Sequence, residues 1–348
     1  MENINLKHLT MDNIENISIA HRGFGKGMGN FWVKKSSISL TLVKITVVAF
    51  VIAVLAGCGP QKEEKTIEKV NEVVQQEENL YGRFLKGEVA ATTGENYLAD
   101  PESYPLEKGR SYTLEELGWH INSNYLNPEY RFDKGRTSYD EIQYAYMECL
   151  DSEGKNLLIK FKGLDIYSEN DDSYTVMVVA EDGNRLYITY QYDCWDRSEK
   201  CAYKRGQIVG SGSSGAGAHG SNLSVILSNG KCVQIFERQA LDGEWISSVN
   251  NKIYNEVFDG SLELASDSDW EIYITTVGDE KYYQYDIEDC SEEEKALCEN
   301  YIDRCREEAS INWTTDAAVL EAIKNRCAEL GFDYEETEAL VEVEWISN

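Results

Sequence analysis

The turn from Asp151 to Leu157 carries side chains of the kind that bind calcium. Its sequence, DSEGKNL, offers carboxylate oxygens from Asp151 and Glu153 and an amide oxygen from Asn156. Calcium in proteins takes about six to eight oxygen ligands, and the ammonium group of Lys155 opposes a divalent cation in the same loop. We therefore interpret this segment as a hairpin turn that has lost the capacity to bind calcium.

The glycine-rich stretch 210–220, GSGSSGAGAHG, has two possible chemical interpretations. A phosphate-binding loop would end in Gly-Lys followed by Ser or Thr, and this stretch does not. His219 with Ser211, Ser213 or Ser214 would suit nucleophilic catalysis, but the GxSxG pattern and its strand–turn–helix setting are missing. The composition favours a flexible or sharply turning link between strands.

Carboxylates and aromatic residues are both abundant. Paired carboxylates hydrolyse glycosidic bonds, but 62 acidic residues furnish many pairs and designate none. The chain also has 22 tyrosines and 7 tryptophans, with Trp195 at the tip of an expected hairpin. These rings favour a surface that stacks on sugars as one alternative, and core or sheet-surface packing as the other.

The charge of the chain excludes one class of partner. It has 62 acidic and 33 basic residues, a formal net charge of −29. Without residues 1–57 the count becomes 59 acidic against 27 basic residues, a net charge of −32. A surface without a basic stripe cannot release counterions from nucleic acid, so no nucleic-acid partner is expected.

The cysteines favour an oxidising compartment. The nine are Cys58, Cys149, Cys194, Cys201, Cys232, Cys290, Cys298, Cys305 and Cys327. If Cys58 is modified, eight remain, an even number that favours disulfides in an exported domain. Cys194 and Cys201 bracket a hairpin and suit a bridge, while Cys298 and Cys305 share a helix face and can pair with a flanking cysteine. No CxxC occurs, so no metal or cofactor is predicted.

A short apolar run precedes Cys58. Lys34, Lys35 and Lys44 lead into ITVVAFVIAVLA (45–56), twelve residues without a charge. This length suits a signal peptide and falls short of the ~20 residues that span a bilayer. An uncleaved membrane helix over residues 38–56 is the alternative.

The run ends in Leu55-Ala56-Gly57-Cys58, which resembles the lipobox of bacterial lipoproteins. The resemblance implies cleavage before Cys58 and a diacylglyceryl group on its sulfur, which would anchor the protein at the outer face of the cell membrane. Two acyl chains hold a protein firmly, whereas one binds only marginally. Residues before Met28 fit a signal peptide poorly, so we expect translation to start at Met28 or Met11.

Beyond the signal peptide (1–57), we expect a polar tether (58–65) and a single extracellular α+β domain (66–348). An amphipathic helix is predicted to end at Gly87, and Thr113 with Glu116 forms a capping box. Alternating apolar runs punctuated by EDGN (181–184) and SNGK (228–231) predict an antiparallel β meander as the core, over about 140–287.

The C-terminal part, about 290–348, is predicted to be mainly helical, with a final strand. Ser291 with Glu294 opens one helix, and a second runs from Asp316 to a stop at Gly331. The run LVEVEWI (340–346) alternates as the last strand.

Several segments together carry a family resemblance: YAYMECLDSEGKNLL (144–158), IKFKGLDIYS (159–168) and GSSGAGAH (212–219). They resemble an uncharacterised family of secreted and lipid-anchored proteins of clostridia-type bacteria. In that family a strand leads into an acidic turn similar to those of FG-GAP or VCBS repeats. The resemblance implies no activity, and Lys155 departs from the acidic pattern.

These observations favour a lipid-anchored, non-catalytic binding or envelope-associated domain, with a glycan or another envelope component as a possible partner. An envelope hydrolase that cuts glycans with unidentified carboxylates is the alternative. A transport receptor is disfavoured because it needs alternating strand–helix units.

Overall fold

The computed structural model describes residues 79–101, 103–126, 138–164, 166, 173–215, 217–243, 245–258 and 270–348. The chain divides into two compact units, residues 1–83 and 84–348. The second unit holds both sheets. The signal peptide, the tether and Cys58 lie outside the described residues, as does most of the predicted first helix. Its described end, α4 (Leu80–Leu85), stops before Gly87, which has a φ of +73°.

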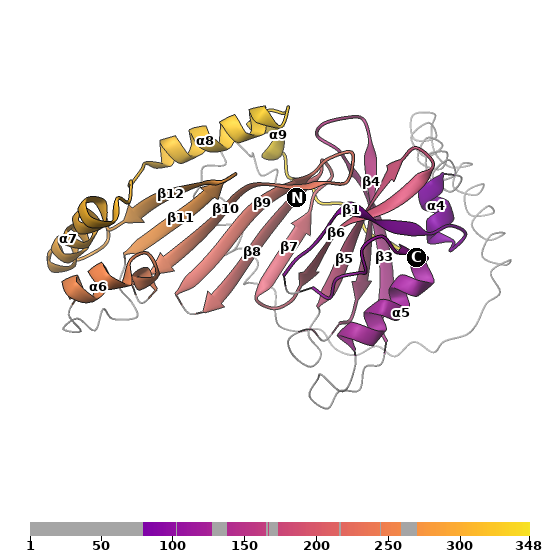
Figure 1. The fold of residues 1–348 in the computed structure, drawn as a ribbon, viewed down its shortest axis with the longest axis horizontal. Coiled ribbons are helices and arrows are strands. Elements are labelled where there is room, and N and C mark those ends of the chain that lie inside the picture. Colours follow the sequence, from indigo (N-terminus) through magenta and orange to yellow (C-terminus); the bar gives the residue numbers. More distant parts are fainter. Residues whose placement is uncertain are drawn as a thin grey trace, which may run out of the picture. The chain divides into compact units, whose positions relative to one another are not determined.

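Two sheets and a set of helices form the second unit, which confirms the α+β class (Figure 1). Sheet A has the order β13-β3-β4-β5-β6-β1-β2 and sheet B has the order β12-β11-β10-β9-β8-β7. The strands of sheet A are β1 (Ala91–Ala99), β2 (Ser111–Tyr112), β3 (Glu141–Glu148), β4 (Lys155–Lys162), β5 (Tyr174–Asp182), β6 (Arg185–Cys194) and β13 (Ile346–Ser347). The strands of sheet B are β7 (Ser198–Ala202), β8 (Gln207–Gly215), β9 (Ala218–Ile226), β10 (Cys232–Asp242), β11 (Glu271–Val277) and β12 (Glu280–Asp286).

Two of the helices begin at the capping boxes predicted for them, whereas the helix over residues 251–258 lies inside the region predicted as a β meander. The other helices of the described chain are α5 (Leu114–Tyr125), the 3-10 turn η3 (Ile246–Ser248), α6 (Asn251–Phe258), α7 (Glu292–Ala309), α8 (Asp316–Glu329) and α9 (Tyr334–Thr337). Thr113 and Ser291 each accept a hydrogen bond from the backbone of a glutamate three residues later, completing both capping boxes. Gly331 follows α8 with a φ of +90°, as the helix stop requires.

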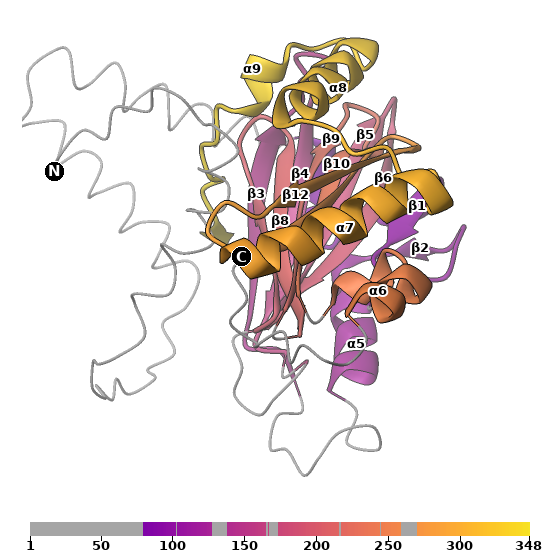
Figure 2. The ribbon, with the colours of Figure 1, turned by 90° about the vertical axis from the view of Figure 1, so that its left-hand side faces the viewer.

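Sheet A packs on one face of sheet B, and the contact forms a continuous core. Tyr190 and Tyr192 of β6 lie in one buried cluster with Ile208 of β8 and Ile226 of β9. At the other end of this same face, α6 and α7 cover Leu241 and its neighbours in a second buried cluster. Figure 2 shows α7 crossing the end of the sheet, with α6 beside it.

Helix α8 covers the opposite face of sheet B. It contacts β10 and β11, and Asp316 accepts a hydrogen bond from the side chain of Gln284 on β12. Gln284 and Thr275 are buried beneath it. Both faces of sheet B are therefore covered in part, as expected of a sheet that needs apolar contacts on each side.

Several sequence predictions need correction. The sequence predicted no strand between Gly87 and Thr113, but the structure has β1 there, and it pairs in parallel with β6. The final strand is wrong in extent, because only Ile346–Ser347 pairs with β3, and Glu342 makes a single isolated bridge to Tyr203. Parallel pairing and strand ends depend on distant segments, which local alternation does not specify.

The glycine-rich stretch is also corrected, because most of it lies inside β8 and β9 rather than in a link between strands. The eight cysteines of the described chain are free thiols, so no bridge joins Cys194 to Cys201. Instead, the sulfur of Cys194 accepts a hydrogen bond from the backbone N–H of Lys200 at 3.2 Å. Among the described residues, no helix has the length and hydropathy needed to cross a membrane.

Candidate binding site

The part of sheet B that neither sheet A nor helices α6 and α7 cover is the candidate site. Directly paired residues of a sheet place their side chains on the same face, so the register identifies this surface. One row runs Lys200–Gly210–Asn222–Glu237–Thr276–Lys281, and the next runs Ser198–Gly212–Gly220–Gln239–Ile274–Tyr283. We call these two rows, with Tyr285 and Trp313 beside them, the open face.

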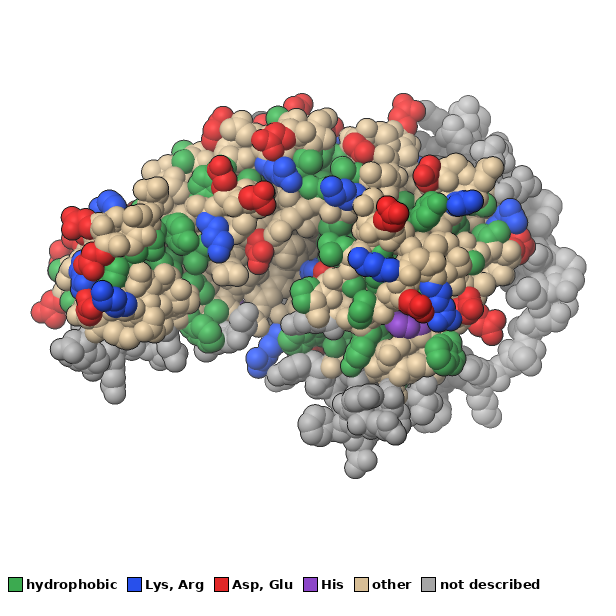
Figure 3. All heavy atoms as spheres, viewed as in Figure 1, with side chains coloured by type: hydrophobic (Ala, Val, Ile, Leu, Met, Phe, Trp, Pro, Cys, Tyr) green, Lys and Arg blue, Asp and Glu red, His purple; other side chains and the backbone are tan. Residues whose placement is uncertain are grey.

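Figure 3 shows the open face from the side on which α6 lies in front of the strands. The surface is hollowed between the helices at one end and sheet A at the other. Uncharged polar side chains and backbone cover most of the hollow, and hydrophobic side chains gather beside α6 and α7. The site is therefore polar in its centre and apolar at one end, a combination that suits small-molecule or polymer binding.

The centre of the open face contains glycines, which have no side chains to project above the strands. Gly210, Gly212 and Gly220 occupy neighbouring positions on β8 and β9. A Cβ atom at Gly210 would lie 2.7 Å from the amide nitrogen of Asn222, so the Asn222 side chain lies across that glycine. At Gly220 the nearest such atom is a backbone oxygen at 3.9 Å, and the space above it is open.

Two amide side chains on the open face have free hydrogen-bonding capacity. Within the described part of the chain, neither Asn222 nor Gln239 makes a side-chain hydrogen bond, and Gln239 is exposed. Each amide group offers two donors and one acceptor oxygen. These groups can therefore hydrogen-bond a ligand without breaking an existing contact.

The apolar end of the open face is an aromatic cluster of Tyr283, Tyr285 and Trp313. Each tyrosine ring meets Trp313 edge to face, with centroids 6.1 Å and 5.5 Å apart. The indole N–H of Trp313 donates to the backbone oxygen of Ile302, which holds the ring in place. Tyr285 is 40% exposed, so a rigidly supported aromatic surface faces solvent here.

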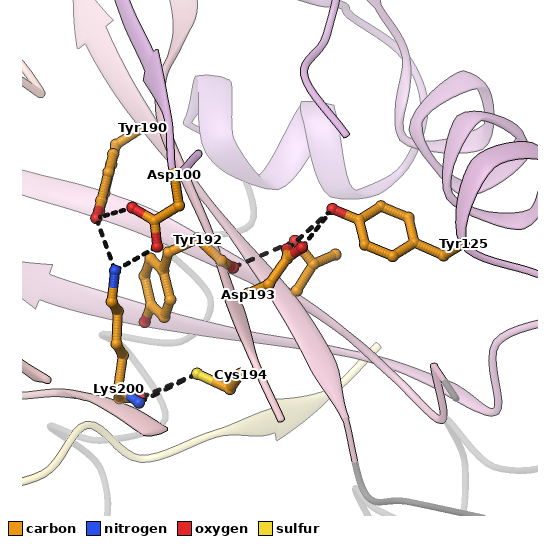
Figure 4. Close-up of polar contacts among 8 residues, drawn as sticks. Asp100, Tyr125, Tyr190, Tyr192, Asp193, Cys194 and Lys200 are labelled. Atoms are coloured by element: carbon orange, nitrogen blue, oxygen red, sulfur yellow. Dashed lines mark hydrogen bonds and ion pairs between the residues drawn. The ribbon is translucent and has the colours of Figure 1, made fainter. Parts of the chain in front are cut away.

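At the other end, Lys200 is held in an ion pair with Asp100 (Figure 4). The hydroxyl of Tyr190 donates to the same carboxylate at 2.8 Å. Only 15% of the Lys200 side chain and 18% of the Asp100 side chain are exposed. Burial, with the nearby Cys232 and Asp100, raises the pKa of Tyr190 well above its usual range, so this phenol stays protonated. The cluster of Lys200, Asp100 and Tyr190 is therefore neutral overall where it borders the open face.

A second polar network, on the other side of sheet A, stabilises the fold. Asp193 points to the other side of sheet A, and both of its oxygens accept from the hydroxyl of Tyr125 on α5 at 2.9 Å (Figure 4). Gln191 donates to the same hydroxyl at 3.0 Å. Burial raises the pKa of Asp193 to about 6. This network joins α5 to sheet A and does not reach the open face.

The acidic turn predicted as a former calcium loop holds another turn instead. Asp151 accepts hydrogen bonds from the backbone N–H and the hydroxyl of Ser228, both at 2.8 Å. Its carboxylate thus fastens the β3–β4 turn to the β9–β10 turn. Among the described residues, no group of three or more Asp, Glu, His or Cys side chains is arranged to hold a metal.

The face opposite the open face carries Ser211, Ser213 and His219 of the glycine-rich stretch. The register places Ser213 opposite His219 and Ser211 opposite Ser221. His219 is exposed, and the next residue across its row is Ala240, which cannot orient an imidazole. Within the described chain no carboxylate hydrogen-bonds the His219 ring, so the pair lacks the base–acid contact of a nucleophile–base–acid set.

Three carboxylates also align on this opposite face. Asp242, Glu271 and Asp286 stand in one row across β10, β11 and β12. The hydroxyl of Tyr273 donates to Glu271, and the backbone N–H of Glu288 donates to Asp286 at 3.0 Å. Two of the three carboxylates thus have local structural partners, and the row gives the hydrolase hypothesis candidates for mutation.

Sequence reasoning missed the open face. A usable signal was present, because Gly210 and Gly212 are two residues apart and therefore lie on one face of a strand. Their partners Gly220 and Asn222 show the same spacing. The strands were missed because glycine-rich composition more often indicates a turn.

Comparison with known proteins adds no relative. No family model, no curated protein and no solved structure matches the chain. Function must therefore be inferred from the residues of this chain.

Proposed function

We infer that this protein is a non-catalytic binding protein of the cell envelope, anchored by lipid on Cys58 and displaying the open face outside the cytoplasm. The proposed location at the cell envelope rests on the apolar run 45–56 and the lipobox-like Leu55–Cys58. The polar tether that follows would separate the folded domain from the membrane surface.

The observation that carries the binding function is the pair of free amides in the hollow of the open face. The half-buried amide of Asn222 and the exposed amide of Gln239 lose little by exchanging water for a ligand of matching geometry. The aromatic cluster adds apolar area next to them, which supplies binding free energy that hydrogen bonds alone rarely give. We therefore assign this surface as the binding site.

The anchor is tested by the intact mass of the protein extracted from its native membrane. We expect a chain that begins at Cys58 and carries the mass of its acyl groups. A mass that retains residues before Cys58 without lipid would replace the lipid anchor with an uncleaved membrane helix.

The binding site is tested by filling it. Gly220→Leu places a side chain in the hollow, where the nearest atom to its Cβ lies 3.9 Å away, so the fold should tolerate it. The matched control, Ser221→Leu, alters the next residue and points to the opposite face. With full-length protein in detergent, co-sedimentation with purified cell envelopes should fall for Gly220→Leu alone. Equal sedimentation of both variants and wild type would remove the open face as the site.

A further inference from the structure

We propose that the open face binds an uncharged polysaccharide chain. The aromatic end of the face would stack on sugar rings, and its amide side chains would hydrogen-bond sugar hydroxyl groups. The proposal rests on the proposed function and names the ligand class of the same site. Three observations carry it: the aromatic cluster with its exposed Tyr285, the two free amides and the balance of charge.

The aromatic cluster suits the apolar faces of sugar rings. A pyranose ring presents C–H groups above and below its plane, and these pack against the face of an aromatic ring. Tyr285 is exposed while its edge contact with Trp313, at 5.5 Å between centroids, fixes its orientation. Because the ring is already held, little side-chain freedom is lost on binding.

The free amides suit hydroxyl groups. A sugar hydroxyl both donates and accepts hydrogen bonds, and so does each amide of Asn222 and Gln239. A carboxylate or phosphate would instead select guanidinium or ammonium groups. Gln239 and Tyr283 stand in one row with Ile274 between them, so one ligand can meet the amide and the aromatic end together.

The charges of the open face are balanced, which favours an uncharged ligand. Lys200 pairs with Asp100, and the other two charged residues of the rows, Glu237 and Lys281, carry opposite charges. The whole chain carries a net charge of −29. An acidic polymer would therefore be repelled, and the single glutamate of the rows, Glu237, provides little attraction for a cationic one.

The length of the surface favours a chain over a single small sugar. The rows cross neighbouring strands from β8 to β12, and strands lie ~4.8 Å apart, so the face extends for ~19 Å. Gly220 leaves open space beside the amide of Gln239, because the nearest atom to a Cβ there would be 3.9 Å away. At Gly212 the backbone oxygen of Arg197 lies 2.9 Å from the same position, so the open path ends there. Several sugar units can lie along the rest of the face.

The test is affinity electrophoresis of the full-length protein in detergent through gels that contain one polymer each. The neutral probes are β-1,4-glucan, α-1,4-glucan, xylan and mannan, and the acidic probe is polygalacturonate. We expect at least one neutral polymer to retard the protein, and Tyr285→Ala and Gln239→Ala each to weaken that retardation about tenfold, which corresponds to ~1.4 kcal/mol.

Two controls separate the open face from the rest of the surface. Trp119→Ala removes an aromatic ring that is 68% exposed on α5, and His219→Ala alters the opposite face of β9. Both should bind as wild type does. Circular dichroism melting of each variant excludes loss of folding as the cause.

Three results would overturn the proposal: no retardation by any neutral polymer, retardation by polygalacturonate alone, or equal loss in the controls and the open-face variants. If envelope binding is lost in Gly220→Leu while no neutral polymer binds, the polysaccharide proposal fails and the binding function stands. If neither envelopes nor polymers bind, both fail.

Discussion

Asp193 carries a buried carboxyl group beneath α5. Burial raises its pKa from 3.8 to about 6, although Thr175 and Tyr125 act in the opposite direction. The folded protein therefore binds this proton more tightly than the unfolded chain does. Its contribution to stability is greatest at low pH, falls between about pH 4 and pH 6, and is constant above that. At about 1.4 kcal/mol per pKa unit, the difference is about 3 kcal/mol.

Replacing Asp193 by Asn should remove this dependence, because an amide does not titrate and can still accept from Tyr125. We expect the free energy of unfolding to vary less between pH 4 and pH 6 than in wild type, and to be higher at pH 7. Urea denaturation at each pH measures both. Asp182→Asn, at the exposed end of β5, is the control. An unchanged pH profile in Asp193→Asn would contradict the burial argument.

Gly230 occupies a turn that touches sheet A. Its φ is +76°, and a Cβ atom there would lie 2.5 Å from the hydroxyl of Thr189 and 2.7 Å from the Cβ of Ala180. Gly230→Ala should therefore destabilise the protein by about 3–4 kcal/mol through backbone strain and overlap together.

The matched control is Gly183→Ala, which has a φ of +60° but no atom within 4 Å of the added methyl group. It should cost about 1–2 kcal/mol from the backbone alone. Thermal denaturation of both variants measures the difference, and equal losses would contradict the contact at Gly230.

At the scale of elements, the two sheets are fastened at their turns. Asp151 joins the β3–β4 turn to the β9–β10 turn through two hydrogen bonds. Asn156, which is fully buried, adds a third connection by donating to the backbone oxygen of Leu227 at 2.9 Å. These contacts join segments more than 70 residues apart and set the packing of sheet A on sheet B.

Asp151→Ala should lower stability by about 1–2 kcal/mol, since the exposed carboxylate gives two hydrogen bonds that solvent partly replaces. The loss of stability should be the same in buffer with calcium and in buffer with a chelator, because the Asp151 carboxylate accepts hydrogen bonds from Ser228 and we expect it to bind no metal. Glu153→Ala in the same turn should change little. If calcium raised the melting temperature of the wild type, and raised that of Asp151→Ala less, the turn would be a calcium-binding loop after all.

At the scale of the whole molecule, the open face exists because sheet A covers only part of sheet B. Sheet A contacts the end near Ile208 and Ile226, while α6 and α7 cover the end near Leu241. The uncovered strands between them are polar because apolar residues there would remain in water. The hollow is thus a consequence of how the layers are placed.

The net charge of −29 should make the protein less stable at low ionic strength, because like charges repel in the compact state. Raising sodium chloride from about 10 mM to about 500 mM shortens the screening length well below 10 Å, so the melting temperature should rise. Potassium chloride at the same ionic strength should give the same rise, because screening depends on ionic strength. A melting temperature that falls with salt would show that attractive ion pairs outweigh the repulsion.

Many local features were predictable from the sequence. Thr113 and Ser291 begin helices through contacts that span three residues, and Gly183 and Gly230 mark turns because their positive φ suits glycine. The apolar runs of β4, β5 and β6 were equally readable as strands, and the structure buries consecutive side chains in each of them, so both faces of these strands are covered. The lipidation of Cys58 remains a prediction of the sequence.

The tertiary structure alone decided the rest. The parallel pairing of β1 with β6 and the short final strand depend on partners far along the chain. The open face depends on the register that brings Gly212, Gln239 and Tyr283 into one row. A local signal arises from neighbours a few residues apart, whereas register and layer packing arise from the burial of whole surfaces, which no short segment encodes.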